Sequence, residues 1–346
     1  MKAVRLHAYD ERPQVEEVAE PQITNPFDVI VRIGGAGLCR TDWHIIEGQW
    51  RDKTGIELPY TLGHENAGRV HEVGSAVEHI QVGDPVIVHP LKTCGFCLAC
   101  RSGDDMHCDN SAFPGIDTDG GFAELLKTTA RAVVTLPATL EPKDVAAHAD
   151  AGLTAYHAVK KASRMLSPGT RAVMIGAGGL GHIGIQVLRA LSAAEIIVVD
   201  KRARTLDLAL RWGADHTVLA DGTQVEQVND LTDGHGAEAV IDFVGEFGAV
   251  EDGVAMLRPH GRYYVVGYGD SLKIPLIDVI STEVSFVGNL VGTYVDLVEL
   301  MTLAAAGTVT LHTNEYPLEA FDDALSDLVE DRMQGRGILV PAGAAA

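Results

Sequence analysis

Short apolar runs alternate with turn residues over roughly the first 150 positions of the chain. Three of these runs, at positions 29–33, 67–73 and 84–89, are rich in β-branched residues and are separated by Gly, Pro and Asp. This pattern is typical of β-strands joined by turns. We therefore predict a mostly β unit that extends from the start of the chain to about position 150.

After Thr170 the pattern changes to strand, glycine turn and helix in alternation. Apolar runs at 171–175, 195–200, 237–245 and 262–268 predict strands, and amphipathic segments at 179–191 and up to 210 predict helices. A repeat of this kind favours an α/β fold with a doubly wound parallel sheet. Helices expected at 294–306 and 318–331 and a final strand at 337–341 fit the repeat poorly, so we expect them to return to the first unit.

Length, composition and charge narrow the class of protein. A chain of 346 residues exceeds what one hydrophobic core usually serves, which supports two units. Hydrophobic residues make up 46%, yet no apolar run approaches the ~20 residues of a membrane span. The net charge of -21 disfavours nucleic-acid binding, and the first residues lack the apolar segment of a secretion signal. We expect a cytoplasmic protein with a small-molecule substrate and neither a nucleic-acid nor a membrane partner.

The cysteines suggest metal binding. Four of the five lie in one short segment: Cys94, Cys97, Cys100 and Cys108. Four thiolates form a closed tetrahedral zinc site, which holds a loop in shape and leaves no position open for chemistry. An iron–sulfur cluster is the main alternative, but its cysteine run closes with a shorter gap and a proline, whereas Asp109 follows Cys108. We predict a structural zinc site in this segment.

A second set of candidate metal ligands is dispersed along the chain. It comprises Cys39 in GLCRTDWH, His64 and Glu65 in GHEN, and Asp150. Thiolate, imidazole and carboxylate are all competent at a catalytic zinc, which needs about three protein ligands and one exchangeable position. Each residue alone has a simpler interpretation, because a lone cysteine is more often a small core residue. Their occurrence together with a cysteine-rich loop favours the metal site.

A glycine-rich loop follows the apolar strand at 171–175 and opens a helix. Its residues are Gly176, Gly178, Gly179, Leu180 and Gly181. Such glycines let the backbone approach a pyrophosphate, whose charge is met by the helix N-terminus, although a plain packing turn is the alternative. The next strand ends at Asp200, where a carboxylate can bind the adenosine ribose of NAD. Three cations nearby could instead suit the extra phosphate of NADP: Lys201, Arg202 and Arg204.

Together these motifs resemble the zinc-containing medium-chain alcohol dehydrogenase family, from MKAVRL to GRGILVP and so over nearly the whole chain. The resemblance implies a GroES-like β-rich catalytic domain at residues 1–153 and 289–346, and a Rossmann NAD-binding domain at 154–288. It also implies an NAD-dependent enzyme of class EC 1.1.1, most similar to 1.1.1.1, which oxidises a primary or secondary alcohol to an aldehyde or ketone. Two zinc ions per subunit and a homotetramer, as in microbial relatives, are further expectations.

The resemblance assigns the catalytic zinc to Cys39, His64 and Asp150, with Glu65 as a further candidate. Asp42 orients the ring of His64. One departure concerns the third ligand, because many members of the family have a cysteine where this chain has Asp150, directly before GLT. Some bacterial secondary-alcohol dehydrogenases are similar at this position.

The resemblance also implies the other site residues. Proton transfer would involve Thr41 and then His44. Coenzyme contacts are implied for Arg40, Thr154 and Arg336, and the substrate pocket for Trp50 and Leu91. Simpler roles remain open, since arginines and histidines are often surface residues and a large aromatic side chain usually belongs to a core or an interface.

Two alternative functions also remain open. One is a polyol or amino-alcohol dehydrogenase of the same architecture. The other is a non-catalytic protein that binds NADPH or is stabilised by zinc, although relatives of this kind generally lack the zinc ligands. Because pocket volume decides which alcohol is bound, the sequence leaves the substrate open.

Overall fold

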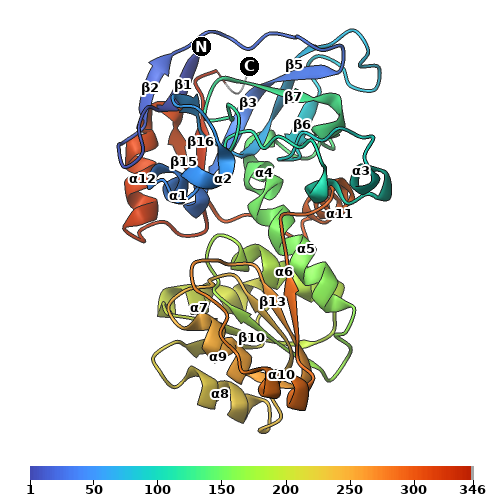
Figure 1. The fold of residues 1–346 in the computed structure, drawn as a ribbon, viewed down its shortest axis with the longest axis vertical. Helices are drawn as coiled ribbons and strands as arrows, with labels where there is room; N and C mark the ends of the chain where they lie inside the picture. The colour runs from blue at the N-terminus through green and yellow to red at the C-terminus, as the bar shows by residue number, and fades with distance from the viewer. Residues whose placement is uncertain (344–346) are drawn as a thin grey trace. The chain divides into compact units, whose positions relative to one another are not determined.

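The computed structural model describes residues 1–343, which form two compact units. Unit 1 comprises Met1–Leu153, Gly292–Gly307 and the segment from Leu311 on, and unit 2 comprises Thr154–Val291 and Thr308–Thr310. The chain therefore enters unit 2 within α5 (Ala151–Ser163) and returns to unit 1 at Gly292. The strands of unit 1 form two sheets, and those of unit 2 form one (Figure 1).

Within the described residues, unit 1 has a seven-stranded sheet and a three-stranded sheet. The larger sheet runs in the order β15-β16-β3-β5-β6-β8, and β7 also pairs with β3. Its strands are β3 (Asp28–Leu38), β5 (Glu65–Val73), β6 (Pro85–Val88), β7 (Leu125–Thr129), β8 (Val133–Thr135), β15 (Thr313–Pro317) and β16 (Arg336–Val340). The smaller sheet has the order β2 (Gln14–Glu17), β1 (Lys2–Leu6) and β4 (Tyr60–Thr61).

Strand β3 lies at the centre of unit 1. All of its residues except Arg32 are buried, so it reads as an almost continuous apolar run and not as an alternating one. It pairs antiparallel with β5, and in this register Gly37 lies opposite Glu65. Cys39, which follows the end of β3, is thereby brought close to the start of β5.

The helices of unit 1 are mostly short. They are α1 (Arg40–Ile46), α2 (Arg51–Thr54), α3 (Leu98–Ser102), α4 (Pro142–Val145), α11 (Tyr294–Ala305) and α12 (Phe321–Val329). The last two occur where helices were predicted after position 290. Helix α12 joins the core of unit 1 through Phe321, whose ring centroid is 5.6 Å from that of Phe122. Strand β16 pairs antiparallel with β3, so segments about 300 residues apart lie side by side in the larger sheet.

Unit 2 contains a parallel sheet with the order β11-β10-β9-β12-β13-β14. Its strands are β9 (Arg171–Ile175), β10 (Glu195–Asp200), β11 (His216–Leu219), β12 (Ala237–Asp242), β13 (Leu257–Val265) and β14 (Ser285–Gly288). The chain winds outward from β9 to β11 and then in the opposite direction from β12 to β14. The direction therefore reverses between β9 and β12, which is where ligands bind in doubly wound sheets. The predicted fold class is confirmed.

Helices lie beside this sheet in unit 2 (Figure 1). They are α6 (Gly181–Leu191), α7 (Ala203–Trp212), α8 (Gln224–Leu231), α9 (Ala249–Ala255), α10 (Leu276–Thr282) and most of α5. The central strands are buried on both faces, and their apolar side chains form a core with residues from α8 and α9. Among residues 1–343, no helix has the length and apolar character that a membrane crossing requires.

Candidate active site

Four potential metal ligands from distant parts of the chain come together in unit 1. They are Cys39, His64, Glu65 and Asp150, and their ligand atoms all lie within 4.8 Å of one another. Cys39 is the N-cap of α1, His64 directly precedes β5, and Asp150 directly precedes α5. The first three residues are buried, and the side chain of Asp150 is 15% exposed. The set therefore combines a thiol, an imidazole and two carboxyl groups in a largely buried place.

Two carboxylates lie on opposite sides of the His64 imidazole. Nδ1 is 3.2 Å from Asp42 Oδ1, and Nε2 is 3.4 Å from Asp150 Oδ2. Asp42 is itself held by the backbone N–H of Cys39, 2.8 Å from Oδ2. Burial alone lowers the pKa of His64, but the charge of Asp42 and the contacts with both carboxylates raise this pKa well above its ordinary value. The site is therefore one that attracts a positive charge.

A zinc ion fits this set of side chains. Both ring nitrogens of His64 are buried and, among the described residues, neither makes a hydrogen bond. Such an imidazole suits a metal ligand whose second nitrogen is oriented by a carboxylate, the role that Asp42 can fill. Thiolate, imidazole and carboxylate are the donor types that zinc binds.

Glu65 has a strong partner of its own. Arg336 Nε donates to Glu65 Oε2 at 3.0 Å, Arg336 Nη2 also donates to Oε1, and the backbone N–H of Ala151 donates to Oε1 at 3.1 Å. The room for this carboxylate depends on Gly37, because a Cβ atom there would overlap it. Burial raises the pKa of Glu65, and the charge of Arg336 opposes that rise. Glu65 thus lies among the potential metal ligands while its charge is balanced by Arg336.

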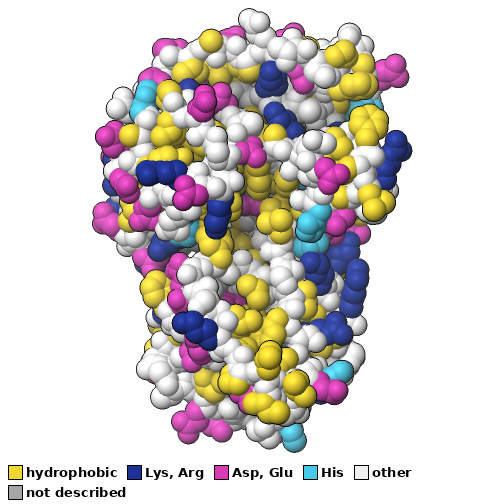
Figure 2. All heavy atoms as spheres, viewed as in Figure 1, with side chains coloured by type: hydrophobic (Ala, Val, Ile, Leu, Met, Phe, Trp, Pro, Cys, Tyr) yellow, Lys and Arg dark blue, Asp and Glu magenta, His cyan; other side chains and the backbone are white. Residues whose placement is uncertain are grey.

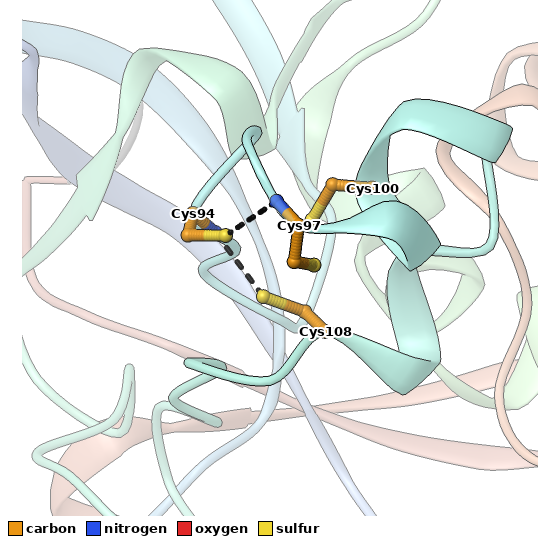
Figure 3. A group of neighbouring side chains, drawn as sticks. All are labelled: Cys94, Cys97, Cys100 and Cys108. Atoms are coloured by element: carbon orange, nitrogen blue, oxygen red, sulfur yellow. Dashed lines mark hydrogen bonds between the residues drawn. The ribbon is translucent and has the colours of Figure 1, made fainter.

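The four clustered cysteines form a second site. Figure 3 shows their sulfur atoms turned toward one another, and the Sγ atoms lie within 4.8 Å of one another. The site is built from α3, which begins after Cys97, and from the 3₁₀ turn Asp105–His107, which ends before Cys108. Backbone amides point at two of the sulfurs: the N–H of Cys97 donates to Cys94 Sγ at 3.4 Å, and that of Cys94 donates to Cys108 Sγ at 3.3 Å. This arrangement fits a tetrahedral zinc site with four thiolates.

The thiols of this lobe differ in acidity. Backbone hydrogen bonds from Phe96 and Cys97 lower the pKa of Cys94 to about 6, whereas burial raises the pKa of Cys100 to about 11. A cation that binds all four sulfurs removes this difference, because ligating thiols are deprotonated. Arg131 binds the 3₁₀ turn that precedes Cys108, since its Nη2 donates to Asp105 Oδ1 at 2.8 Å.

The glycine loop in unit 2 joins the end of β9 to α6. Gly176 has φ +85°, a conformation that favours glycine, and a Cβ atom on Gly181 would overlap the carbonyl oxygen of Gly176. Asp200 holds the loop, because its Oδ2 accepts from the N–H of Ala177 at 2.9 Å. Its other oxygen accepts from the backbone N–H of Arg202 at 2.9 Å. The carboxylate therefore lies at the end of β10, beside the loop that the sequence predicts to bind a pyrophosphate.

Comparison with known proteins gives the same assignment for both units. Residues 25–138 match the family model of the alcohol dehydrogenase GroES-like domain, and residues 179–306 match that of the zinc-binding dehydrogenase domain. The chain is 36% identical to an NAD-dependent alcohol dehydrogenase of Sulfurisphaera tokodaii over 352 residues, which cover 99% of this chain and 100% of the relative. The chain belongs to the zinc-containing medium-chain alcohol dehydrogenase family. The family predicted from the sequence is confirmed.

Two further similarities within this alcohol dehydrogenase family are informative. The crystal structure of the alcohol dehydrogenase from Aeropyrum pernix superposes with a TM-score of 0.96 at 47% identity, and covers 99% of this chain and 100% of that one. A D-arabinose 1-dehydrogenase (NADP(+)) of Saccharolobus solfataricus is 34% identical over 98% of this chain and 97% of its own length. The D-arabinose dehydrogenase, at 34% identity, is thus about as similar to this chain as the NAD-dependent alcohol dehydrogenase of Sulfurisphaera tokodaii, at 36%.

The structure also places the remaining residues that resemblance to the alcohol dehydrogenases singles out. Thr41 and His44 lie on α1, the helix that Cys39 caps. Trp50 precedes α2 and is half-buried; it packs against the core of unit 1, with Lys53 Nζ 5.4 Å from its ring centroid. Leu91 is buried in unit 1, Arg40 is exposed, and Thr154 is half-buried on α5. Their functional roles stay predictions.

The ion pair of Arg336 with Glu65 was not predicted from the sequence. The motifs gave no signal that Arg336 pairs with Glu65, since the two residues are 271 positions apart. The contact between Asp42 and Cys39 had a local signal, because an acidic residue three positions after an N-cap can accept from the N-cap backbone.

Proposed function

We propose that this chain transfers a hydride between the carbon of a primary or secondary alcohol and NAD, and that the product is an aldehyde or a ketone. The observation that carries the proposal is the largely buried group of Cys39, His64 and Asp150, in a chain that also folds a dinucleotide-type glycine loop. Several full-length relatives are alcohol dehydrogenases, so the predicted enzyme class is confirmed, together with zinc and NAD as its cofactors.

Cys39, His64 and Asp150 hold the catalytic zinc in this proposal. When bound, zinc supplies a Lewis acid that lowers the pKa of an alcohol. One thiolate, one carboxylate and a neutral imidazole balance the charge of Zn²⁺. Asp42 keeps the imidazole in place through its contact with Nδ1 at 3.2 Å. Glu65 remains hydrogen-bonded to Arg336 in this proposal. It is the next candidate ligand to test if Asp150 does not bind zinc.

Helix α1 carries the path of the proton. Thr41, two residues after Cys39, accepts the proton of the alcohol, and His44 passes it on to solvent. The position of both residues on α1, the helix that Cys39 caps, supports this assignment. His44 is largely buried, with 9% of its surface exposed.

Unit 2 binds the coenzyme. The glycine loop approaches the pyrophosphate, and Asp200 accepts hydrogen bonds from the adenosine ribose, which favours NAD over NADP. Further contacts with the coenzyme are assigned to Arg40, Thr154 and Arg336. For Arg336 this requires that a guanidinium already bonded to Glu65 also serves the coenzyme.

The second zinc belongs to the four-cysteine lobe and stabilises it. Because four protein sulfurs complete a tetrahedron, this ion has no position for a substrate. The substrate pocket at the other site is lined in this proposal by Trp50 and Leu91. A bulky indole there favours small alcohols, and a polyol is the alternative class.

We also propose that the chain forms a homotetramer in the cytoplasm. Helix α10 supports association, because Leu276, Ile277 and Ile280 are 78%, 66% and 71% exposed. Figure 2 shows apolar side chains gathered on this part of unit 2. Strand β14 lies next to α10 in sequence and forms one edge of its sheet, so it can pair with another chain. Light scattering of the purified protein measures the number of subunits, and cell fractionation tests the location.

Zinc content measured together with activity tests the function. The wild-type chain should contain two zinc ions and form NADH from at least one alcohol in a panel of primary, secondary, aromatic and polyhydroxy compounds. Cys39→Ser should lose activity with little change in thermal stability, whereas Cys97→Ser should lower stability. A fully active preparation with one zinc ion per chain would contradict the two-site proposal. A chain that oxidises no alcohol of the panel would contradict the activity.

A further inference from the structure

The direction of winding in the parallel sheet reverses between β9 and β12, and one segment borders this point on each side. The glycine loop leaves β9 on one side, and the turn Phe243–Gly245 leaves β12 on the other. The strand register places Asp242 opposite Ile175, the residue before Gly176, and the N–H of Phe243 donates to the carbonyl oxygen of Ile175 at 3.0 Å. Because dinucleotides bind at this point of doubly wound sheets, the turn after β12 forms the second wall of the coenzyme site.

A buried carboxylate holds this turn. Asp242 is 1% exposed, and its side chain accepts three hydrogen bonds: from the hydroxyl of Tyr263 at 2.6 Å and from the backbone N–H groups of Val244 and Gly245 at 2.8 and 3.0 Å. Its backbone carbonyl accepts from the N–H groups after β13, at Val266 and Gly267. An ionised group is costly to bury unless it is hydrogen-bonded, so this set of bonds strongly restricts where the turn can lie.

The turn that Asp242 holds packs directly on the glycine-rich segment. A Cβ atom on Gly176 would lie 2.6 Å from Val244 Cγ2, and one on Gly184 of α6 would lie 2.8 Å from Phe243 Cζ. The side chains of Val244 and Phe243 therefore pack against the backbone of the glycine-rich segment at positions where only glycine leaves room for them. A shift of the turn by a few tenths of an ångström would be transmitted to the loop, because tightly packed interiors leave no slack.

We propose that Asp242 and Tyr263 are positioning residues for the coenzyme: the phenol fixes the carboxylate, the carboxylate fixes the turn, and the turn fixes the glycine loop. Tyr263 is fully buried on β13, and its hydroxyl donates to Asp242. The inference rests on the proposed function in one respect, namely that the loop binds NAD. It adds two residues that the glycine motif does not contain.

Removing a single hydroxyl tests this inference, and the next residue provides a matched control. Tyr264 is also buried on β13, but side chains alternate along a strand, and its hydroxyl contacts the carbonyl oxygen of Lys161 at 3.4 Å. We expect Tyr263→Phe to weaken the binding of NADH about tenfold in a fluorescence titration, equivalent to about 1.4 kcal/mol. Tyr264→Phe should bind NADH within about twofold of wild type, whatever its loss of thermal stability.

The split between binding and turnover provides a second readout. With saturating NAD, Tyr263→Phe should keep kcat within about twofold of wild type, because the hydroxyl acts on the position of the loop and not on the reacting atoms. Asp242→Asn keeps an oxygen for the two backbone N–H groups and should weaken NADH binding less than Asp242→Ala. In the double variant Tyr263→Phe/Asp242→Asn, the two effects on the dissociation constant should not add, because both act through one hydrogen bond.

Two outcomes would overturn the inference. Equal NADH affinities for Tyr263→Phe and Tyr264→Phe would show that the phenol serves stability alone, and the proposed function would stand. A wild-type chain that bound neither NADH nor NADPH would overturn the inference together with the proposed function. The wild-type titration therefore distinguishes the two failures.

Discussion

Arg336→Ala tests the buried ion pair beside the candidate zinc site. The side chains of Arg336 and Glu65 are 5% and 0% exposed, and the guanidinium donates to both carboxylate oxygens. After the substitution, only the backbone N–H of Ala151 remains among the donors described for Glu65. A carboxylate would then lie in the core of unit 1 without a counter-charge from Arg336.

The burial of this pair sets the size of the expected loss. Removing one partner of a buried pair typically costs about 3 to 5 kcal/mol, because the other charge is left unpaired. The exposed pairs of Arg332 are a control, since its side chain is 51% exposed, its Nε lies 2.8 Å from Asp327 Oδ1 and its Nη1 contacts Glu330. Breaking an exposed pair costs about 0.2 to 1 kcal/mol. Arg336→Ala should therefore lower the free energy of unfolding several-fold more than Arg332→Ala.

Urea unfolding of unit 1 measures this difference. Trp43 and Trp50 pack against the core of unit 1, whereas Trp212 lies on α7 of unit 2. In a Trp212→Phe background the fluorescence therefore reports on unit 1. The double variant Glu65→Gln/Arg336→Met should recover much of the loss, since neither charge remains buried. If Arg336→Ala lost no more than Arg332→Ala, the argument from burial would be refuted.

Three other predictions concern metal binding and pH. Asp150→Ala should lose one of two zinc ions while His148→Ala keeps both; elemental analysis measures this, and two zinc ions in Asp150→Ala would remove that residue from the ligand set. After zinc is chelated at about pH 7, Cys94 should react with iodoacetamide faster than Cys100, because their pKa values are about 6 and about 11; mass spectrometry of the labelled peptides measures the rates, and equal rates would contradict the prediction. Burial lowers the pKa of His89, so its contribution to stability is present above its ordinary pKa and is lost as the pH falls through the lowered value. His89→Gln should therefore flatten the fall in unfolding free energy between about pH 7 and pH 5, and an unchanged slope would count against this role.

The local chemistry of this protein could be predicted from its sequence. Strand β9, the glycine loop and α6 are consecutive, so the change from an apolar run to glycines and then to a helix was visible along the chain. The same holds for the cysteine lobe, because all four sulfurs come from one loop of 15 residues, Cys94 to Cys108. The dispersed ligands needed the family resemblance, since no local pattern links Cys39 to Asp150.

Partner choice over long sequence separations was decided only by the tertiary structure. Arg336 reaches Glu65 because β16 and β5 both pair with β3, and Tyr263 reaches Asp242 because β13 lies beside β12. Which strands become neighbours depends on how the whole chain buries its apolar surface, and no local sequence pattern determines that arrangement. Burial then sets how strongly each ion pair affects stability. The same Arg and Glu on an exposed helix would form a weak surface pair, but in the core of unit 1 removing either one leaves the other charge unpaired.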